Sequence, residues 1–450
     1  MTGARLPWAD AHWARRGRMS GSHISLDPWF DSYADRSSGL SASEVRSLFA
    51  VASRPEVVSL AGGMPYVRAI PDTLMKQTLN RVIDERGPEA LQYGSGQGHP
   101  ELREQIVDIM ALEGIRARPD DIVVTTGSQH GLDLIARLFV NPGDVVIAEA
   151  PSYVGAMGVF RSYEADVRHV EMDEDGIIPE RLTEAISAAR AEGKPIKMIY
   201  LIPNFHNPAG VTLSGARRME IIDIAQSEGI LIVEDNPYGL LWFDHAPPPA
   251  MRAASDEGII YLGSFSKTFG PGLRVGWVVA PHGIREKLVL ANEAAVLSPS
   301  SFSQLVVTEY FQHSDWVAQI DTFRGVYQER RDAMVAALAH ELPGVHHTMP
   351  TGGFYLWLTL PAGLDSKEML PRAVTELVAY TPGTAFYADD RGTENLRLAF
   401  CYPTPEDIKE GVSRLAKVIR EEVELIETFE PSRDTSPIDT HVESPPPNLS

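Results

Sequence analysis

The stretch Ile196–Tyr238 reads IKMIYLIPNFHNPAGVTLSGARRMEIIDIAQSEGILIVEDNPY and holds two short apolar runs. The runs Ile196–Ile202 and Gly229–Val233 are nearly continuous in apolar residues, as strands buried on both faces of a sheet are. Ser214–Glu228, between them, is expected to form a helix. A buried strand, a helix and a second buried strand in succession predict a mostly parallel sheet with helices on both of its faces.

The same alternation extends on both sides of this stretch. The other strands expected in the large sheet are Asp121–Thr125, Val145–Ala148, Val167–Met172, Ile259–Leu262 and Val275–Ala280. The helices expected with them are one from about Ser43, Glu101–Glu113, one that follows Thr126–His130, and Pro179–Glu192, with Pro at its first position. The expected fold class is therefore α/β.

The chain changes character after about residue 310. His313–Leu342, Asp365–Tyr380 and Pro405–Phe429 are expected helices, Phe354–Leu360 alternates like a half-buried strand, and Asn395–Cys401 is a further expected strand. Helices over a few strands predict a second, smaller α+β domain. From Glu430 onward the chain is acidic, rich in Pro and Ser and without periodicity, which predicts a disordered tail.

Polar clusters follow several of the expected strands. They contain Gly127, Tyr153, Asn207, Asp235 and Ser264. Ligands of open α/β sheets bind beyond the carboxyl ends of the strands, so these residues are expected to meet at one site. At Gly127 a strand turns directly into a helix, whose first backbone N–H groups are suited to holding a phosphate.

Gly263–Gly276 reads Gly-Ser-Phe-Ser-Lys-Thr-Phe-Gly-Pro-Gly-Leu-Arg-Val-Gly and places Lys267 among small residues and hydroxyls. Ser264, Ser266 and Arg274 are suited to binding an anion beside the Lys267 amine. An amine nucleophile next to an anion site fits a Schiff-base lysine beside the phosphate of its cofactor. The other interpretation of this stretch alone is a surface lysine in a glycine-rich turn.

Composition excludes several classes of function. The chain has 450 residues and a formal net charge of −21, which argues against a nucleic-acid partner. Cys401 is the single cysteine, so an internal disulfide and a multi-cysteine metal site are excluded, and a reducing cytoplasm is expected. No apolar run approaches the roughly 20 residues of a membrane helix. The first 25 residues lack the apolar segment of a secretory signal.

These motifs, in this order, resemble those of the pyridoxal-phosphate aminotransferases of fold type I, class I/II. The central ones are Asn207-Pro-x-Gly, Asp235-x-x-Tyr238, Ser264-x-Ser-Lys267 and Arg274. Ala-Gly-Gly-x-Pro, Gln-Tyr-x-x-x-x-Gly, Thr-Gly-Ser-Gln, Glu-Ala-Pro-Ser-Tyr and Pro-Gly-x-x-Phe also occur, and they resemble the branch of aminoadipate, kynurenine and broad-specificity aminotransferases. The match covers roughly Ser43 to Phe429.

The resemblance implies a role for each matching residue. Lys267 would be the Schiff-base lysine and the base that moves the substrate proton, and Asp235 would pair with the pyridine nitrogen of pyridoxal 5'-phosphate. Asn207 and Tyr238 would form hydrogen bonds with the hydroxyl group of the cofactor ring, and Tyr153 would stack on the face of that ring. The phosphate would be held by Gly127, Ser128, Gln129, Ser264, Ser266, Arg274 and, from the neighbouring subunit of a homodimer, Tyr93.

The resemblance also implies the substrate contacts and the domains. Arg397, Gly62, Gly63, Asn207 and Arg46 would bind an amino acid or 2-oxo acid, with Arg397 on the α-carboxylate. Arg46 as a solvated surface residue and Arg397 as a salt-bridged strand residue are the alternatives. The expected domains are a disordered extension 1–40, a segment 41–90 that joins the small domain and the substrate pocket, a large cofactor-binding domain 91–310, a small domain 311–429 and a disordered tail 430–450.

The expected reaction is transamination from an L-amino acid of aminoadipate, aromatic, branched-chain or kynurenine type to 2-oxoglutarate. A lyase, decarboxylase or racemase on the same fold is an alternative. A second alternative is the binding domain of a regulator, which would need a basic DNA-binding domain before Ser43, where only about forty turn-rich residues stand. His206 departs from the family pattern, in which a polar residue such as Gln is more frequent at this position. Its ring would either alter the pocket or pack beneath it.

Overall fold

The computed structural model describes Trp29, residues 32–39 and residues 54–429. The chain divides into a short unit, Met1–Ser38, and a long unit, Gly39–Ser450. In the described part of the short unit, the Ser37 hydroxyl donates to the carbonyl oxygen of Ala34 at 2.7 Å, at the single-turn helix η2 (Asp35–Gly39). The expected helix from Ser43, the extension before residue 29 and the tail 430–450 lie outside the described residues.

The long unit is built on an eight-stranded sheet with the order β2-β9-β8-β7-β6-β3-β4-β5. The strands are β2 (Ile122–Thr125), β3 (Val145–Ala150), β4 (Asp166–Asp173), β5 (Gly176–Ile177), β6 (Ile196–Leu201), β7 (Leu231–Asp235), β8 (Ile259–Ser264) and β9 (Gly276–Val279). Neighbours from β8 through β4 pair in parallel, whereas β9 is antiparallel to both of its neighbours and β5 is antiparallel to β4. The expected mostly parallel sheet is confirmed.

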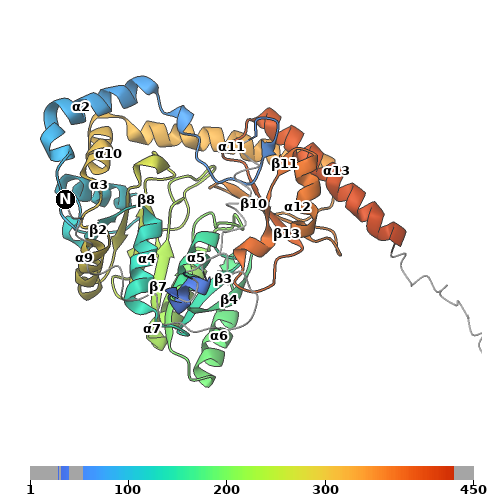
Figure 1. Ribbon diagram of the computed structural model, residues 1–450, viewed down its shortest axis with the longest axis horizontal. Helices are drawn as coiled ribbons and strands as arrows, with labels where there is room; N and C mark the ends of the chain where they lie inside the picture. The colour runs from blue at the N-terminus through green and yellow to red at the C-terminus, as the bar shows by residue number, and fades with distance from the viewer. Residues whose placement is uncertain (1–28, 30–31, 40–53, 430–450) are drawn as a thin grey trace, which may run out of the picture. The chain divides into compact units, whose positions relative to one another are not determined.

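Helices cover both faces of this sheet (Figure 1). One face is covered by α4 (Ser128–Phe139), α5 (Val154–Ser162) and α9 (His282–Val296), and the other by α6 (Pro179–Ala191), α7 (Gly215–Glu228) and α8 (Met251–Ala254). Val146 of β3 packs in the first layer and its neighbour Val145 in the second, and both are fully buried. Burial on both faces explains why the strands are apolar at successive positions instead of alternating.

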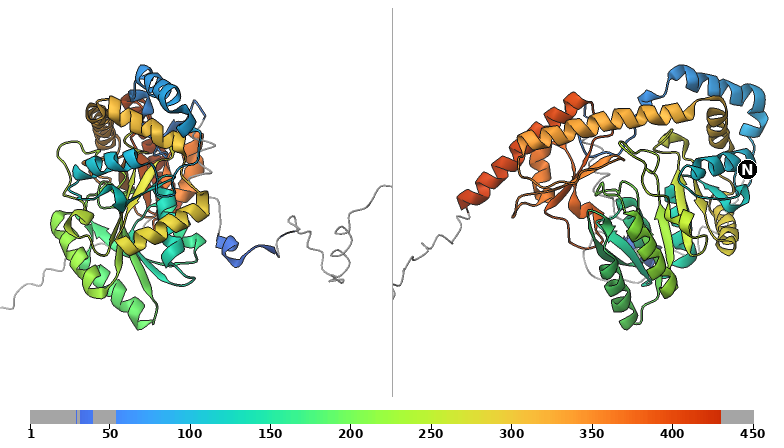
Figure 2. Two further views of the ribbon diagram at one scale, coloured as in Figure 1. Left: turned by 90° about the vertical axis from the view of Figure 1, so that its left-hand side faces the viewer. Right: turned by 180° about the vertical axis from the view of Figure 1, so that it is seen from behind.

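A smaller antiparallel sheet has the order β10-β13-β12. Its strands are β10 (Tyr355–Thr359), β12 (Thr381–Pro382) and β13 (Asn395–Ala399), and α11 (Trp316–Glu341), α12 (Ser366–Thr375) and α13 (Pro405–Phe429) belong to the same region. Figure 2 (right) shows the orange α11 reaching to this sheet, where it lies along the red α13. The expectation of a half-buried strand at Phe354–Leu360 is wrong, because both faces of β10 are buried: Leu356 and Leu358 on one face, Tyr355 and Trp357 on the other.

The expected helix Asp365–Tyr380 is too long at its carboxyl end. Helix α12 ends at Thr375, and Leu377 has a positive φ of 59° that a helix cannot continue through. Val378–Ala379 then forms the short strand β11, which pairs in parallel with β1 (Val58–Ser59). This pairing anchors the segment that leads from β1 into Gly62 and Gly63.

Some helices have no counterpart in the sequence expectations. These are α2 (Asp72–Ala90), α5, α8, α9 and α10 (Ser301–His313), while the expected Glu101–Glu113 is found as α3 (Pro100–Ala111). Single turns of 3-10 helix occur at η3 (Val67–Ala69), η4 (Pro119–Asp121), η5 (Pro271–Leu273) and η6 (Gly383–Phe386). Within residues 54–429 and the short described segment before them, none of the helices is both long and apolar enough to span a bilayer.

Candidate active site

The strand ends converge as the parallel sheet requires. Asp235 is the last residue of β7, Ser264 is the last residue of β8, and Ser128 begins α4 just after β2. Strand β9 runs in the opposite direction, so its first residue, Gly276, lies between Thr125 and Ser264 in the register. This reversal brings Arg274, two residues before β9, to the same edge.

A cradle for an anion forms at this edge. The Ser264 hydroxyl donates to the Ser266 hydroxyl at 2.9 Å, and Arg274 Nη1 lies 3.4 Å from the same Ser266 oxygen. Gly127 caps α4 with a φ of 82°, and a Cβ at this position would be 2.5 Å from Arg274 Nη2. Glycine is therefore required at position 127, and the first N–H groups of α4 face the arginine, an arrangement that suits a phosphate.

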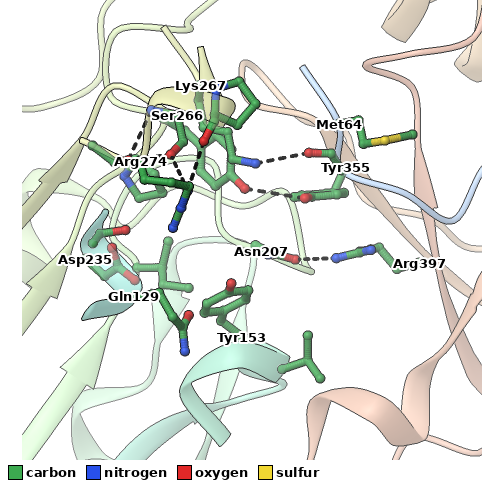
Figure 3. A pocket seen from close by; sticks show the side chains of 18 residues that line it. Met64, Gln129, Tyr153, Asn207, Asp235, Ser266, Lys267, Arg274, Tyr355 and Arg397 are labelled. Carbon is green, nitrogen blue, oxygen red and sulfur yellow. Dashed lines mark hydrogen bonds between the residues drawn. The ribbon is translucent and has the colours of Figure 1, made fainter. Parts of the chain in front are cut away.

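Lys267 lies next to this cradle, in a loop that follows β8. Its Nζ, in the pocket of Figure 3, donates to the carbonyl oxygen of Gly63 at 3.0 Å. The same atom lies 5.4 Å from the centre of the Phe354 ring. Burial lowers the pKa of Lys267 to about 8, and the positive charges of Arg397 and Arg274 act in the same direction. A lysine in these surroundings has a sizeable neutral fraction near pH 8, as an amine nucleophile needs. The alternative of a surface lysine is excluded.

Asp235 faces the cavity with one free oxygen. Its Oδ2 accepts a hydrogen bond from the Tyr200 hydroxyl at 2.7 Å, whereas its Oδ1 is buried and has no hydrogen-bond partner among the described residues. Burial raises the pKa of Asp235 to about 6, although the Tyr200 bond acts in the opposite direction. A buried carboxylate with an unpaired oxygen is suited to a ligand that carries a positive charge or an N–H group.

Arg397 and Asn207 meet across the cavity from Asp235. Arg397 comes from β13, and its Nη1 donates to Asn207 Oδ1 at 2.8 Å. Its Nη2 donates to the carbonyl oxygen of Ala61 at 2.6 Å, and its Nε has no partner among the described residues. Arg397 has no carboxylate partner there, so the salt-bridged strand residue is not observed, and this buried guanidinium is suited to a carboxylate ligand.

The side chains around these groups enclose a cavity of about 300 Å³. Of the residues named from the sequence, those lining it are Gly63, Ser128, Gln129, Tyr153, Asn207, Asp235, Tyr238, Ser264, Ser266, Lys267, Arg274 and Arg397. Gly127 lies behind the cradle. The remaining lining residues, which sequence reasoning missed, include Met64 and Tyr355. No motif marks Tyr355, which follows the double glycine Gly352–Gly353 at the start of β10.

Other predicted residues lie elsewhere. Gly62 is not part of the lining, and its carbonyl oxygen lies 3.7 Å from the Cys401 thiol. Tyr93 is 78% exposed, outside this cavity. Arg46 lies outside the described residues. His206 is fully buried beneath the cavity with Nε2 3.1 Å from Glu149 Oε2, so its ring packs there instead of lining the site.

The cavity fits pyridoxal 5'-phosphate. The anion cradle suits the phosphate, the Lys267 amine suits the aldehyde, and the unpaired oxygen of Asp235 suits the pyridine nitrogen. Among the described residues no group of His, Cys, Asp and Glu is arranged to hold a metal ion. The sheet and this cavity define a pyridoxal-phosphate enzyme of fold type I.

Comparison with known proteins agrees with this class. Residues 56–415 match the family of class I and II aminotransferases. The chain is 40% identical to aromatic-amino-acid aminotransferase 1 of Thermococcus litoralis, over 87% of this chain and 94% of that protein. It is 35% identical to 2-aminoadipate transaminase of Thermus thermophilus, over 87% of this chain and 97% of that protein. The crystal structure of the Pyrococcus horikoshii kynurenine aminotransferase superposes with a TM-score of 0.83 at 39% identity, over 87% of this chain and 97% of that one.

The chain therefore belongs to the class I and II aminotransferases. It is an enzyme that uses pyridoxal 5'-phosphate to exchange amino groups between amino acids and 2-oxo acids.

Proposed function

We propose that this enzyme moves the amino group of an L-amino acid with an aromatic, aminoadipate-like or branched side chain to 2-oxoglutarate. The observation that carries the proposal is the arrangement of three groups around one cavity. The amine of the half-buried Lys267, a buried carboxylate at Asp235 and a buried guanidinium at Arg397 all face it. These are the three groups that transamination with this cofactor needs: an amine for the exchange, a carboxylate for the ring nitrogen and a guanidinium for the substrate carboxylate.

Pyridoxal 5'-phosphate, when bound, supplies an aldehyde that accepts an amine and a ring that takes up electrons from the substrate Cα. Lys267 Nζ removes the proton from the substrate Cα, and Gly63 O orients this amine. Asp235 Oδ1, which is buried without a partner among the described residues, would keep a proton on the ring nitrogen. Asn207 Oδ1 orients the Arg397 guanidinium, which would bind the substrate carboxylate. The amide nitrogen of Asn207 and the Tyr238 hydroxyl would donate to the ring hydroxyl.

The phosphate contacts follow from the cradle. Arg274, Ser264, Ser266 and the backbone of Gly127, Ser128 and Gln129 would hold the phosphate, and Tyr153 would pack on the ring. Arg274 has a positive φ of 54°, a conformation that non-glycine residues rarely adopt. Backbone strain of this kind is often found where a side chain must be aimed at a ligand.

The substrate class rests on the lining of the cavity and on the relatives. Met64 and Tyr355 present an apolar and aromatic wall, which suits an aromatic or aliphatic side chain. The relatives named above are aminotransferases of aromatic amino acids, 2-aminoadipate and kynurenine. Arg46 would contact the distal carboxylate of an acidic substrate, and the segment 41–90 would join the small domain around the pocket.

We also propose a homodimer with shared active sites. Leu91, Tyr93 and Leu297 are 81%, 78% and 58% exposed, and the Ser298 hydroxyl accepts a hydrogen bond from the Gly94 N–H at 3.3 Å. Exposed apolar residues gathered on adjoining loops indicate a contact surface, and Tyr93 would reach the partner's phosphate from it. The mass of the protein in solution tests this, and a fully active monomer contradicts it.

The buried free thiol of Cys401 supports a cytoplasmic location.

A half-reaction experiment tests the reaction and its substrates. The purified holoenzyme is mixed with single amino acids in the absence of any 2-oxo acid, and its visible absorbance is followed. We expect aromatic, aminoadipate-like or branched L-amino acids to remove the absorbance, because the cofactor's aldehyde becomes an amine. Adding 2-oxoglutarate should then restore it. The D-enantiomers of the same amino acids are the matched controls.

The outcome separates the alternatives. Loss of absorbance that 2-oxoglutarate restores supports transamination. Release of carbon dioxide or ammonia from the amino acid, with no 2-oxo acid product, supports a decarboxylase or a lyase instead. An unchanged spectrum with every L-amino acid contradicts the proposed reaction.

The pH dependence of cofactor capture tests the role of Lys267. Only the neutral amine attacks an aldehyde, and burial holds the pKa of Lys267 at about 8, below its ordinary value of 10.5. We therefore expect the rate at which the apoprotein captures pyridoxal 5'-phosphate to rise about tenfold per pH unit up to pH 7 and to level off above pH 8. Stopped-flow absorbance measures this rate. A rate that keeps rising beyond pH 10 shows that this amine titrates like a free lysine.

A further inference from the structure

Tyr355 contacts both the carboxylate-binding side and the ring-binding side of the cavity. It is the first residue of β10, is 3% exposed and lines the cavity (Figure 3). The register pairs Trp357 with Arg397 across the sheet, so Tyr355 is the diagonal neighbour of Arg397 on one face. The Arg397 guanidinium carbon lies 4.2 Å from the centre of the Tyr355 ring.

This ring contact fixes the plane of the arginine. The Arg397 guanidinium also lies 4.9 Å from the centre of the Phe386 ring. Its Nη atoms donate hydrogen bonds to Asn207 Oδ1, Ala61 O and Thr381 Oγ1. Stacking a guanidinium on an aromatic ring is worth about 0.5–2 kcal/mol. The Tyr355 ring therefore helps to hold Arg397 in the orientation that a carboxylate ligand meets.

The hydroxyl of Tyr355 has a separate contact. The Tyr238 hydroxyl donates to it at 3.4 Å, and the two rings are nearly perpendicular at 88°. A Cβ on Gly63 would be 1.8 Å from the Tyr355 hydroxyl oxygen, so glycine at position 63 makes room for this phenol. The carbonyl oxygen of the same Gly63 accepts a hydrogen bond from the Lys267 amine. The Tyr355 hydroxyl and the Lys267 amine thus both lie against Gly63.

Both phenols keep their protons at neutral pH. Burial raises the pKa of Tyr238 well above its ordinary value, and burial also raises the pKa of Tyr355. Each hydroxyl therefore carries one hydrogen to donate and can also accept. When the Tyr238 hydrogen is directed to a ligand, the Tyr355 hydrogen is free to turn toward the Tyr238 oxygen, and such a chain strengthens the outer donor.

We propose that Tyr355 is a positioning residue of the reaction, in which the ring orients Arg397 and the hydroxyl strengthens the hydrogen bond that Tyr238 donates into the cavity. The inference rests on the proposed roles of Arg397, Tyr238 and Lys267. With pyridoxal 5'-phosphate bound, a stronger donor at Tyr238 would favour the anionic form of the ring hydroxyl. It would thereby lower the pKa that a visible titration of the holoenzyme measures. The Tyr355 ring thus acts on substrate binding through Arg397. The Tyr355 hydroxyl acts, through Tyr238, on the pKa seen in the visible titration.

Two substitutions separate these effects. Tyr355→Phe keeps the ring and removes the hydroxyl, and Tyr355→Leu removes both. Tyr310→Phe is the matched control, because Tyr310 is buried outside the cavity and its hydroxyl has no hydrogen-bond partner among the described residues. Each holoenzyme, loaded with pyridoxal 5'-phosphate, is titrated from pH 5 to pH 10 by visible absorbance. Its kcat and KM are then measured with an amino acid that the half-reaction experiment identifies.

We expect Tyr355→Phe to raise the pKa seen in the visible titration by about 0.5–1 unit, the size of one neutral hydrogen bond, with KM changed less than about twofold. Tyr355→Leu should shift the titration similarly and also raise KM about 2- to 30-fold, as loss of the stacking contact predicts. Tyr310→Phe should match the wild type in both measurements.

A titration of Tyr355→Phe that coincides with the wild type overturns the role of the hydroxyl. An unchanged KM in Tyr355→Leu overturns the role of the ring. Neither result bears on the proposed function itself, which fails instead if the wild-type spectrum does not change with amino acids or if Lys267→Ala retains the wild-type titration.

Discussion

Lys267→Ala is expected to abolish transamination and to remove the visible absorbance of the bound cofactor. Among the described residues, Lys267 is the one lysine that lines the cavity. Removing it takes away both the covalent attachment and the base. A positioned base contributes about 10²- to 10⁴-fold to a rate, and loss of the covalent step adds to this. We therefore expect kcat/KM to fall by at least about 10⁴-fold, measured by the formation of the 2-oxo acid product.

The fold should survive this substitution. The hydrogen bond that Lys267 makes is to one carbonyl oxygen, that of Gly63, and burial holds its pKa at about 8, so its ammonium form is disfavoured in the apoprotein. The unfolding temperature of the apoprotein should accordingly be equal to the wild type's or slightly higher. Lys287→Ala, on the exposed side of α9, is the matched control and should keep full activity. Activity in Lys267→Ala within tenfold of the wild type would remove the centre of the proposed mechanism.

The strands of the large sheet and the polar residues at their ends could be predicted because two local signals coincide. Runs such as Gly229–Val233 are apolar at successive positions, and a parallel sheet places every carboxyl end at one edge. Asp235 and Ser264 therefore line one cavity, and Gly127 lies against Arg274 at its edge, whatever the details of the loops. The motifs around Lys267 and Arg274 then narrowed the chemistry to one cofactor.

What the sequence left out depends on register and on long-range packing. The Tyr200 hydroxyl donates a hydrogen bond to Asp235 because β6 pairs with β7 in a register that places Tyr200 beside Val233. No local sequence pattern specifies that register. Tyr355 reaches the cavity for the same kind of reason, through the pairing of β10 with β13. Helix α2 was missed because it contains Pro88 and a non-helical Arg86, and its buried residues form no continuous apolar stripe.

The lengths of elements failed where a backbone reversal decides them. Helical spacing continues past Thr375, but Leu377 takes a positive φ so that Val378–Ala379 can pair with Val58–Ser59. The half-buried pattern read in β10 failed because its second face is covered as well, with Trp357 against Phe386 at 5.6 Å between ring centres. Both errors arise from contacts between segments more than 25 residues apart in the chain.

Asp235→Asn is expected to lower kcat by about 30- to 5,000-fold. The substitution keeps the volume of the side chain and an oxygen that can accept from the Tyr200 hydroxyl, so it removes chiefly the negative charge. Loss of one partner of a buried charged pair costs about 2–5 kcal/mol, which corresponds to this range of rates. Steady-state kinetics measures the change, and Asp244→Asn, at an exposed aspartate that does not line the cavity, is the control.

Asp235→Asn lowers kcat, but the same substitution is expected to stabilise the apoprotein at neutral and alkaline pH. Burial raises the pKa of Asp235 from 3.8 to about 6, so the folded state binds a proton more tightly than the unfolded state. The stability this contributes is present below about pH 4 and is lost as the pH rises through 6. Above pH 6 the apoprotein thus retains an unfavourable buried charge, which asparagine lacks. We expect the unfolding temperature of Asp235→Asn, relative to the wild type, to be higher at pH 8 than at pH 5. A difference that is the same at both pH values, or reversed, shows that Asp235 is not an unpaired charge awaiting the cofactor.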